Sequence, residues 1–540
     1  MYLIENPVLQ RELLVNLRTW RTFALLFAYN ALLGLVVVLA WPQEQRVNLS
    51  VNPEKAKNLV NLFFLGQYML VSMMAPSFAA GAITGEKERK TYESLLASPL
   101  RPAAIVLGKL LASLAHLAVL MLTSLPIVML CLPLGGVSLY EVLTVYLGLM
   151  LSVMLFGMIS VACSAYFQRT SSALVVSYLL ILPLAITGVG IWNLFGDNGQ
   201  ARLIAVLTVF PMLCTLLGLL LFFGTSRRLL RPPDVGSEGK EVVDPEAENK
   251  TAVGLVIHRD RFPDNLFAPA KRTKLLPDGA NPVYDKEIRS EIFAQGTLML
   301  RVVIQVGMVL ALPLMCFALF IKPEYSPWYL SYVVLFNMLV GPVFSAGSVT
   351  GERERETLDL LLTTILSPAT ILWGKLLSGL RVSSVLTCFL LWPLLLACLL
   401  TGFYWTNWGL TLAYLAIFIL TCVTTTTLAL FASVMFRRTA TSLMMGYVWI
   451  LGLYCLPLAL NFFAREFFTG TQFALAAERL GMLSPFATLF NLPLNAPDAN
   501  ASVVGSWPYF YGYLGCTSGV LLVAWLTMTT LFRRRWTQNE

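Results

Sequence analysis

Charge is scarce in this sequence. Asp, Glu, Lys and Arg make up 13% of the 540 residues, whereas 57% are hydrophobic and the mean hydropathy is +0.72. A soluble domain of this length carries about 25% charged residues. The charges that are present are separated by apolar runs of 20 or more residues. Such runs are typical of membrane-spanning segments, so they exclude an ordinary soluble globular protein.

Motifs that carry chemistry are also missing. The sequence has no G-x-x-x-x-G-K-[ST] phosphate loop, no G-x-S-x-G nucleophile elbow and no C-x-x-C pair. Its two histidines, His116 and His258, share no metal-ligand spacing with carboxylates. The nine cysteines lie in apolar runs, where we expect small apolar side chains inside helices. The chain is therefore predicted to bind no nucleotide, cofactor or metal of its own and not to be an enzyme.

Twelve apolar segments are long enough to cross a bilayer. Lipid cannot satisfy a bare backbone, and runs of this length favour helices over the short alternating strands of a barrel. We therefore predict an all-α polytopic membrane protein. The expected spans are residues 22–41, 59–83, 108–132, 141–167, 172–195, 203–224, 298–321, 329–350, 374–400, 408–435, 442–464 and 509–532.

The basic residues predict the orientation. With the N-terminus inside, the inner segments hold 29 of the 38 Lys and Arg residues and the outer segments hold 7. This bias predicts a multi-pass protein of the cell membrane with both termini in the cytoplasm. It also accounts for the net charge of +8, because basic residues face the anionic inner surface, so no nucleic-acid partner is expected.

The two halves of the chain repeat each other. Residues 85–111 and 351–377 are identical at 15 of 27 positions at an offset of 266, and the sequence FQRT at 167–170 answers FRRT at 436–439. Matches in the same order indicate a duplication of a six-helix unit. We predict a first unit at 1–225, a charged cytoplasmic linker at 226–280 and a second unit at 281–540. An even number of spans per unit places both copies the same way up.

Each half begins with a capped amphipathic segment. Asn6-Pro7 and Asn281-Pro282 provide an N-cap followed by proline at the first helical position. Apolar residues then fall on one face and charged residues on the other, which predicts a short helix lying in the inner interface. A solvated stub is the plainer alternative.

The loop between the second and third spans of each half is too long for a simple turn. Some two dozen residues begin with alternating charge at 86–90 and 352–356 and continue with leucines before a proline. We predict a short cytoplasmic helix in each half, with a charged start that faces a partner and leucines that pack beneath the bundle. The alternative is a charge run that is merely solvated.

These segments resemble the signature of type-2 ATP-binding cassette (ABC) permeases. The resemblance rests on residues 81–111 and 347–377, on the N-terminal NPV elements and on SPFATL at 484–489. It implies an elbow helix before each first span and a coupling helix that docks on a separate ATPase subunit, which would bind ATP and Mg²⁺. Many members carry one six-span unit and dimerise, so the presence of two units here leaves further dimerisation open.

The resemblance also assigns candidate residues. The candidates for coupling to the ATPase are Glu86, Glu88, Arg89, Thr91, Glu352, Glu354, Arg355 and Thr357. The candidates in the elbow helices are Arg11, Glu12, Lys286, Glu287 and Arg289. From the residues alone, His116 and Arg381 in the third spans either line a path or reach from the inner leaflet to the cytoplasm. Asn30, Gln67, Gln305 and Asn337 either bond between helices or touch substrate.

No carboxylate lies in the middle of a predicted span. Secondary transporters driven by protons or sodium commonly place such groups inside the bilayer, so their absence indicates that energy enters from outside the bundle. We therefore predict the permease subunit of an ATP-driven exporter whose substrate the sequence does not reveal. The alternatives are a major-facilitator-type secondary transporter and a non-transporting membrane scaffold.

Overall fold

The computed structural model shows two compact units, residues 1–239 and 240–540. The part that the structure describes consists of residues 53–129, 138–167, 170–194, 204–229, 279–289, 326–354, 356–400, 408–467, 472–492 and 507–538, with a few isolated positions elsewhere. Every regular element within these ranges is a helix, which confirms the predicted all-α fold.

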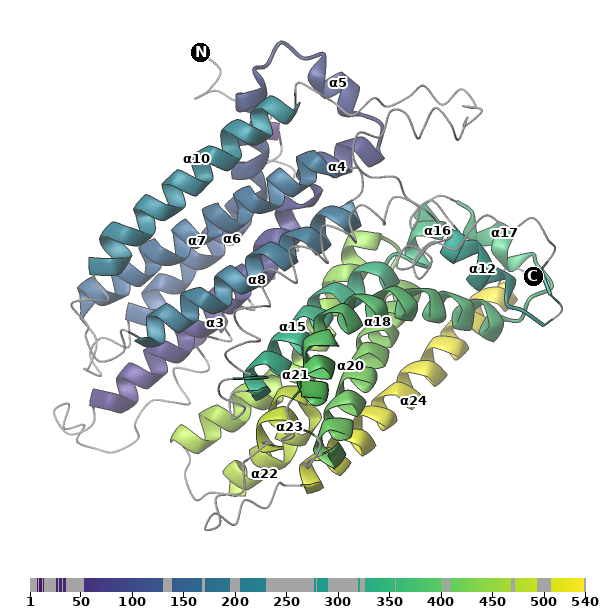
Figure 1. The fold of residues 1–540 in the computed structure, drawn as a ribbon. Coiled ribbons are helices and arrows are strands. Elements are labelled where there is room, and N and C mark those ends of the chain that lie inside the picture. The colour runs from purple at the N-terminus through teal and green to yellow at the C-terminus, as the bar shows by residue number, and fades with distance from the viewer. Residues whose placement is uncertain are drawn as a thin grey trace. The chain divides into compact units, whose positions relative to one another are not determined.

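The first unit is built around one central helix, α7 (Leu139–Tyr166), which contacts α3, α6, α8 and α10 (Figure 1). It begins at a capping box, in which Ser138 accepts from the backbone N–H of Glu141 while the Glu141 carboxylate accepts from that of Ser138. The other helices are α3 (Pro53–Ala79), α4 (Gly81–Glu88), α5 (Tyr92–Leu96), α6 (Pro102–Met129), α8 (Thr170–Leu194), the π-helical turn η2 (Ala205–Val209) and α10 (Phe210–Leu229).

The second unit repeats this plan around α20 (Trp408–Met435), which contacts α15, α18, α21 and α24 (Figure 1). Its other helices are α12 (Pro282–Arg289), α15 (Ser326–Ser345), α16 (Thr350–Glu354), α17 (Leu358–Leu362), α18 (Pro368–Leu400), α21 (Thr439–Phe467), α22 (Gln472–Leu480), the 3₁₀ turn η6 (Gly481–Leu483), α23 (Pro485–Asn491) and α24 (Trp507–Gln538).

Ten of the predicted spans coincide with helices. Among the described residues, nine helices are long and apolar enough to cross a membrane, and α8 contains a shorter apolar stretch, Ala173–Ile186. The predicted first span of each half, 22–41 and 298–321, lies almost wholly outside the described residues. One difference from the sequence prediction matters for function: helical structure extends beyond the second spans, with a break at Ala80 and at residues 346–349, through the charged motif to Glu88 in α4 and Glu354 in α16.

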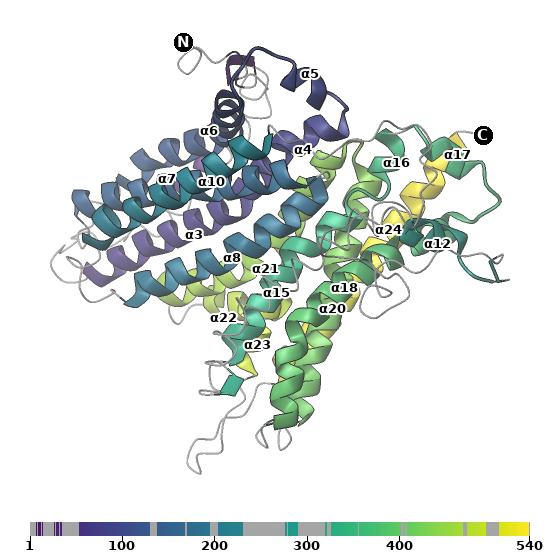
Figure 2. The same ribbon diagram turned by 45° about the horizontal axis from the view of Figure 1, so that its top comes forward.

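The two ends of the second unit differ. The short helices α12, α16 and α17 lie at one end, and α22 and α23 lie at the other (Figures 1 and 2). Residues 485–489 in α23 are buried, and α23 contacts α15, α20, α21 and α24. The described part of segment 465–508 thus forms short helices, of which α23 begins at Pro485 and packs against the bundle.

Candidate functional site

The second span of each unit ends in an unusual helix terminus. In the first unit, the backbone N–H of Thr91 donates to the Glu86 carbonyl at 2.9 Å, and that of Lys90 donates to the Lys87 carbonyl at 3.2 Å. This is the Schellman pattern, whose turn residue adopts a left-handed conformation and is usually glycine. Here that residue is Lys90, with φ of 59°, and the second unit repeats the same turn at Glu356, with φ of 57°.

A carboxylate holds this turn to the third span. Glu86 accepts a hydrogen bond from the Thr91 hydroxyl, and its Oε1 lies 2.7 Å from the ammonium of Lys109 in α6. Glu352 accepts from the Thr357 hydroxyl in the same way. Both carboxylates are thus bonded within their own unit. They hold the start of the segments at 91–100 and 357–366, the predicted coupling segments, to the end of the second span.

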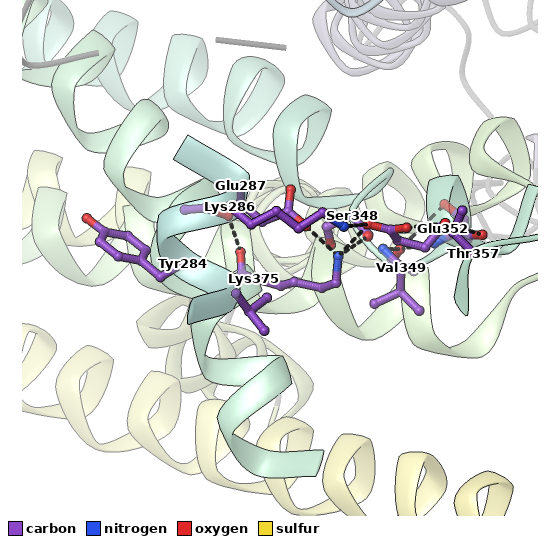
Figure 3. A network of polar contacts seen from close by, with 12 residues as sticks. Tyr284, Lys286, Glu287, Ser348, Val349, Glu352, Thr357 and Lys375 are labelled. Atoms are coloured by element: carbon purple, nitrogen blue, oxygen red, sulfur yellow. Dashed lines mark hydrogen bonds and ion pairs between the residues drawn. The ribbon is translucent and has the colours of Figure 1, made fainter. Parts of the chain in front are cut away.

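In the second unit the elbow helix joins this contact (Figure 3). The ammonium of Lys375, a side chain that is only 1% exposed, lies 2.6 Å from Glu287 Oε1 and 3.7 Å from Glu352 Oε1. It also donates to the Ser348 carbonyl at 2.7 Å. Lys286 completes the cluster with a 2.9 Å ion pair to Glu352. Two lysines and two glutamates therefore link α12, the end of the second span and the start of the third.

The cap predicted for the second elbow helix is present. Asn281 Oδ1 accepts from the backbone N–H of Val283 at 3.0 Å and of Tyr284 at 3.3 Å, while its Nδ2 donates to the Thr370 carbonyl in α18 at 2.8 Å. Val283 and Ile288 are buried, and α12 contacts α18. This elbow is therefore a defined helix fixed to the third span, and a solvated stub is excluded.

The close approach of α12 to α18 requires glycine at position 374. A Cβ at Gly374 would lie 2.9 Å from Asn281 Oδ1 and 3.0 Å from the Val283 side chain. We expect Gly374→Ala to cost about 1–3 kcal/mol, because the cap must shift. Gly351→Ala is the control, since nothing lies within 4 Å of its Cβ, and it should stabilise α16 by up to about 1 kcal/mol. Melting temperatures in detergent would measure both, and equal values would contradict the assignment.

Two further charged residues of the segment 86–90 bind the turn between the fourth and fifth spans. The Lys87 ammonium donates to the carbonyl oxygens that end α7, at 2.7–3.2 Å, those of Ser164, Ala165 and Phe167. Glu88 Oε1 accepts from the backbone N–H of Thr170, the first residue of α8, at 2.8 Å. A cation thus meets a helix C-terminus and an anion meets a helix N-terminus, which is the favourable arrangement for both dipoles. We call this pair of contacts the clasp.

The clasp is present in both units. Arg353 donates to the Phe436 carbonyl at the end of α20. Glu354 accepts from the backbone N–H of Thr439 at 2.8 Å and from its hydroxyl at 2.7 Å. Successive residues of a helix point about 100° apart, so three adjacent side chains reach three different neighbours. The repeats at 85–90 and 167–170 therefore bind each other, a contact that their separate positions in the sequence concealed.

A buried serine strengthens the same junction. Ser164 Oγ accepts from the backbone N–H groups of Ile83 and Thr84 at 3.0 and 2.9 Å, and Ser433 makes the corresponding pair of bonds at 3.0 Å in the second unit. Ile83 and Thr84 lie in the first turn of α4, and Val349 and Thr350 lie where the turn after α15 meets α16. The end of the second span is thus fixed to the fourth span through backbone as well as side chains.

The coupling segments pack against their units through apolar side chains. Leu361, Leu362 and Leu366 lie against a buried cluster from the elbow and the second, third, fourth and sixth spans, which confirms the predicted packing of these leucines. In the first unit, Tyr92 is buried and its hydroxyl donates to the Leu229 carbonyl at the end of α10 at 3.4 Å. Burial raises the pKa of Tyr92 against the opposing effect of Arg228, so the phenol keeps the proton that it donates.

The comparison with protein families decides what these repeats are. The model of the ABC-2 family transporter proteins matches residues 7–231 and again residues 283–535. The chain belongs to this family. No curated protein and no solved structure matches it significantly. It is an ABC-2 permease with two copies of the family unit in one chain, and the signature segments of both copies are the clasps and turns described above.

The other predicted residues of this ABC-2 permease divide into two groups. Arg11 and Arg89 are exposed. Arg381 donates to the hydroxyl of Tyr284 in the elbow helix at 3.4 Å, which favours a position at the elbow end of its span over a path through the bundle. Five predicted residues lie outside the described part of the chain: Glu12, Gln305, Arg355 and the side chains of His116 and Arg289.

Two polar side chains inside the permease bond between helices. Asn337 in α15 donates to Ser383 Oγ in α18 at 3.0 Å and accepts from the Thr425 hydroxyl in α20 at 3.0 Å. Gln67 in α3 donates to Ser124 Oγ in α6 at 2.8 Å. Such bonds are typical of helix packing in membranes. Their geometry supports the interhelical interpretation of these two residues.

Proposed function

We propose that this permease is the membrane subunit of an ATP-driven exporter, and that separate ABC-type ATPase subunits supply the energy. Those subunits bind ATP and Mg²⁺, and they dock on the coupling segments at 91–100 and 357–366. The match to the ABC-2 family supports a transporter permease. ATP coupling and the outward direction are the steps that we add.

The observation that carries the proposal is the clasp with its neighbouring contacts. Through Glu86, Lys87 and Glu88, one short turn of helix is bonded to α5, α6, α7 and α8. The equivalent turn in the second unit also binds the elbow helix, through the ion pair of Glu352 with Lys286. A force applied to a coupling segment is therefore passed to four spans through hydrogen bonds to charged groups, some of them half-buried and some exposed at the surface.

The mechanism that follows is conformational. Closure of two ATPase subunits around ATP draws the coupling segments together, and each clasp carries the movement into spans two to five of its unit. The units then rock and open a central path outward. No residue of this chain performs chemistry; its polar groups hold the moving parts in register.

We further propose that the permease lies in the cell membrane with both termini and both coupling segments in the cytoplasm. The excess of Lys and Arg in the predicted inner segments supports this orientation. A fluorescent protein fused after Glu540 should fold and fluoresce, whereas alkaline phosphatase fused there should be inactive. Active phosphatase at that position would reverse the orientation and place the coupling segments out of reach of ATPases.

Stimulation of ATP hydrolysis tests the function. The permease would be placed in nanodiscs with the ATPase subunits that copurify from native membranes. We expect it to change their hydrolysis rate, and we expect Leu360→Arg to weaken docking about thirtyfold, as loss of a 2 kcal/mol contact does. Leu475→Arg is the matched control, because this similarly exposed leucine lies at the opposite end of the unit (Figure 1). Equal effects of both changes, or no effect of the permease on hydrolysis, would contradict the proposal.

A further inference from the structure

The two coupling segments begin with the same backbone turn, but they expose different side chains. In the first unit none of the residues 86–101, all of which are described, is a large exposed hydrophobic. The exposed side chains there are polar, charged or small. They are Glu88, Arg89, Lys90, Thr91, Glu93, Ser94, Ala97, Pro99 and Arg101. This face is mixed in sign, with three basic and two acidic groups.

The second segment presents apolar side chains among carboxylates. Leu360 is 70% exposed and Ile365 is fully exposed. Within residues 352–367, Arg355 aside, the exposed charged side chains that the structure describes are those of Glu354, Glu356 and Asp359, all acidic. At the offset of 266, the positions of Leu360 and Ile365 are occupied in the first unit by a serine and a proline. The duplicated segments have therefore acquired different surfaces on the same scaffold.

The unit itself does not cover these two side chains. The neighbours Leu361, Leu362 and Leu366 pack inward on the buried cluster, so Leu360 and Ile365 lie on the other side of the segment. An anionic inner membrane surface would repel the three carboxylates around them. Leu360 and Ile365 are exposed apolar side chains on a segment that is bonded to four spans. We therefore expect them to contact a protein partner rather than lipid.

We propose that the two coupling segments dock on two different ATPase subunits. The subunit that binds the second segment has an apolar pocket with basic groups at its rim, and the one that binds the first segment has a polar surface. This inference rests on the proposed function and names its partner as a pair of non-identical ATPases. A symmetric pair would offer the same site twice, and one site cannot complement both surfaces equally well.

Photo-crosslinking at equivalent positions tests the inference. Benzoylphenylalanine would replace either Ser94 or Leu360 in the full chain, expressed in its native membranes, and adducts would be sequenced by mass spectrometry. We expect different ATPase domains at the two positions. The same ATPase domain at both, or lipid adducts at position 360, would overturn the inference and leave the proposed function standing. Absence of any ATPase adduct at either position would instead overturn the proposed function itself.

A pair of variants provides a second, independent measurement. Leu360→Ser combined with Ile365→Ser should release one ATPase species from the purified complex in native mass spectrometry, with at least a tenfold loss of its occupancy. The other species should stay bound, because the first segment is unchanged. Ser94→Ala is the control at the equivalent exposed site and should release neither. Equal loss of both species from the double variant would overturn the inference.

Discussion

Replacing Lys375 by methionine is expected to lower the stability of the second unit by roughly 3–5 kcal/mol. The side chain is 1% exposed, and its ammonium lies close to the carboxylates of Glu287 and Glu352. Without it, two carboxylates in a largely buried position face each other and lose their strongest donor. We also expect the elbow helix to be held less firmly on the third span, where the Asn281 bond to the Thr370 carbonyl and the buried Val283 remain. The apparent melting temperature in detergent and proteolysis near the elbow would measure both effects.

Lys286 is the matched control for this prediction. It binds the same Glu352 carboxylate at 2.9 Å, but its side chain is 58% exposed. An exposed ion pair contributes about 1 kcal/mol or less, so Lys286→Met should shift the melting temperature little. If the two substitutions had equal effects, burial of Lys375 would not be what makes the cluster important.

The second large effect is expected at Glu354. Glu354→Gln should leave the coupling segment exposed for docking but loosen the clasp on α21, because a neutral amide no longer complements the helix N-terminus. The two bonds that Glu354 accepts from Thr439 are exposed and contribute about 1 kcal/mol, so we expect about a fivefold loss of permease-stimulated ATP hydrolysis. Binding of the ATPase should change by less than threefold in a pull-down titration.

Glu356→Gln controls for the loss of one negative charge from the same turn. Glu356 is exposed, and its side chain lies two positions beyond the clasp. This variant should keep the wild-type stimulation in the same nanodisc assay. If it uncouples hydrolysis as strongly as Glu354→Gln, net charge on the turn and not the clasp would be responsible.

Hydropathy and repetition were sufficient to predict much of the fold. Long apolar runs have few options in lipid, so ten of the spans could be placed to within a few residues of the observed helices. The N-cap at Asn281 and the inward leucines also followed from local chemistry. The family was predicted from residues 85–111 and 351–377, and the family match confirms it.

The role of the charged motif could not be predicted in the same way. A helix end of this kind is usually marked by glycine, but here Lys90 and Glu356 adopt the left-handed conformation, so no glycine was present to predict helix ends at Glu88 and Glu354. Once the helix continues, Glu86 and its neighbours point at three different helices. A charge run that was expected to face a partner is in fact bonded mostly to its own unit.

The two copies of the unit share their internal contacts at the end of the second span but expose different side chains on their coupling segments. The contacts that we propose transmit force occur in both units, including the carboxylate that binds the turn threonine and the carboxylate that binds the first residue of the next helix. The exposed positions of the coupling segments differ. A fused chain permits this, because each half can specialise for its own partner while the transmission is retained.

We propose that binding of ATP to the ATPase subunits shortens the distance between the two coupling segments. Spin labels attached at positions 94 and 360 of the ATPase-bound permease would report that distance by pulsed electron resonance. Addition of ATP to a hydrolysis-deficient complex should shift the distribution to shorter distances, and a clasp variant such as Glu354→Gln should leave that shift in place while uncoupling hydrolysis. A distribution that is unchanged by ATP would contradict the mechanism.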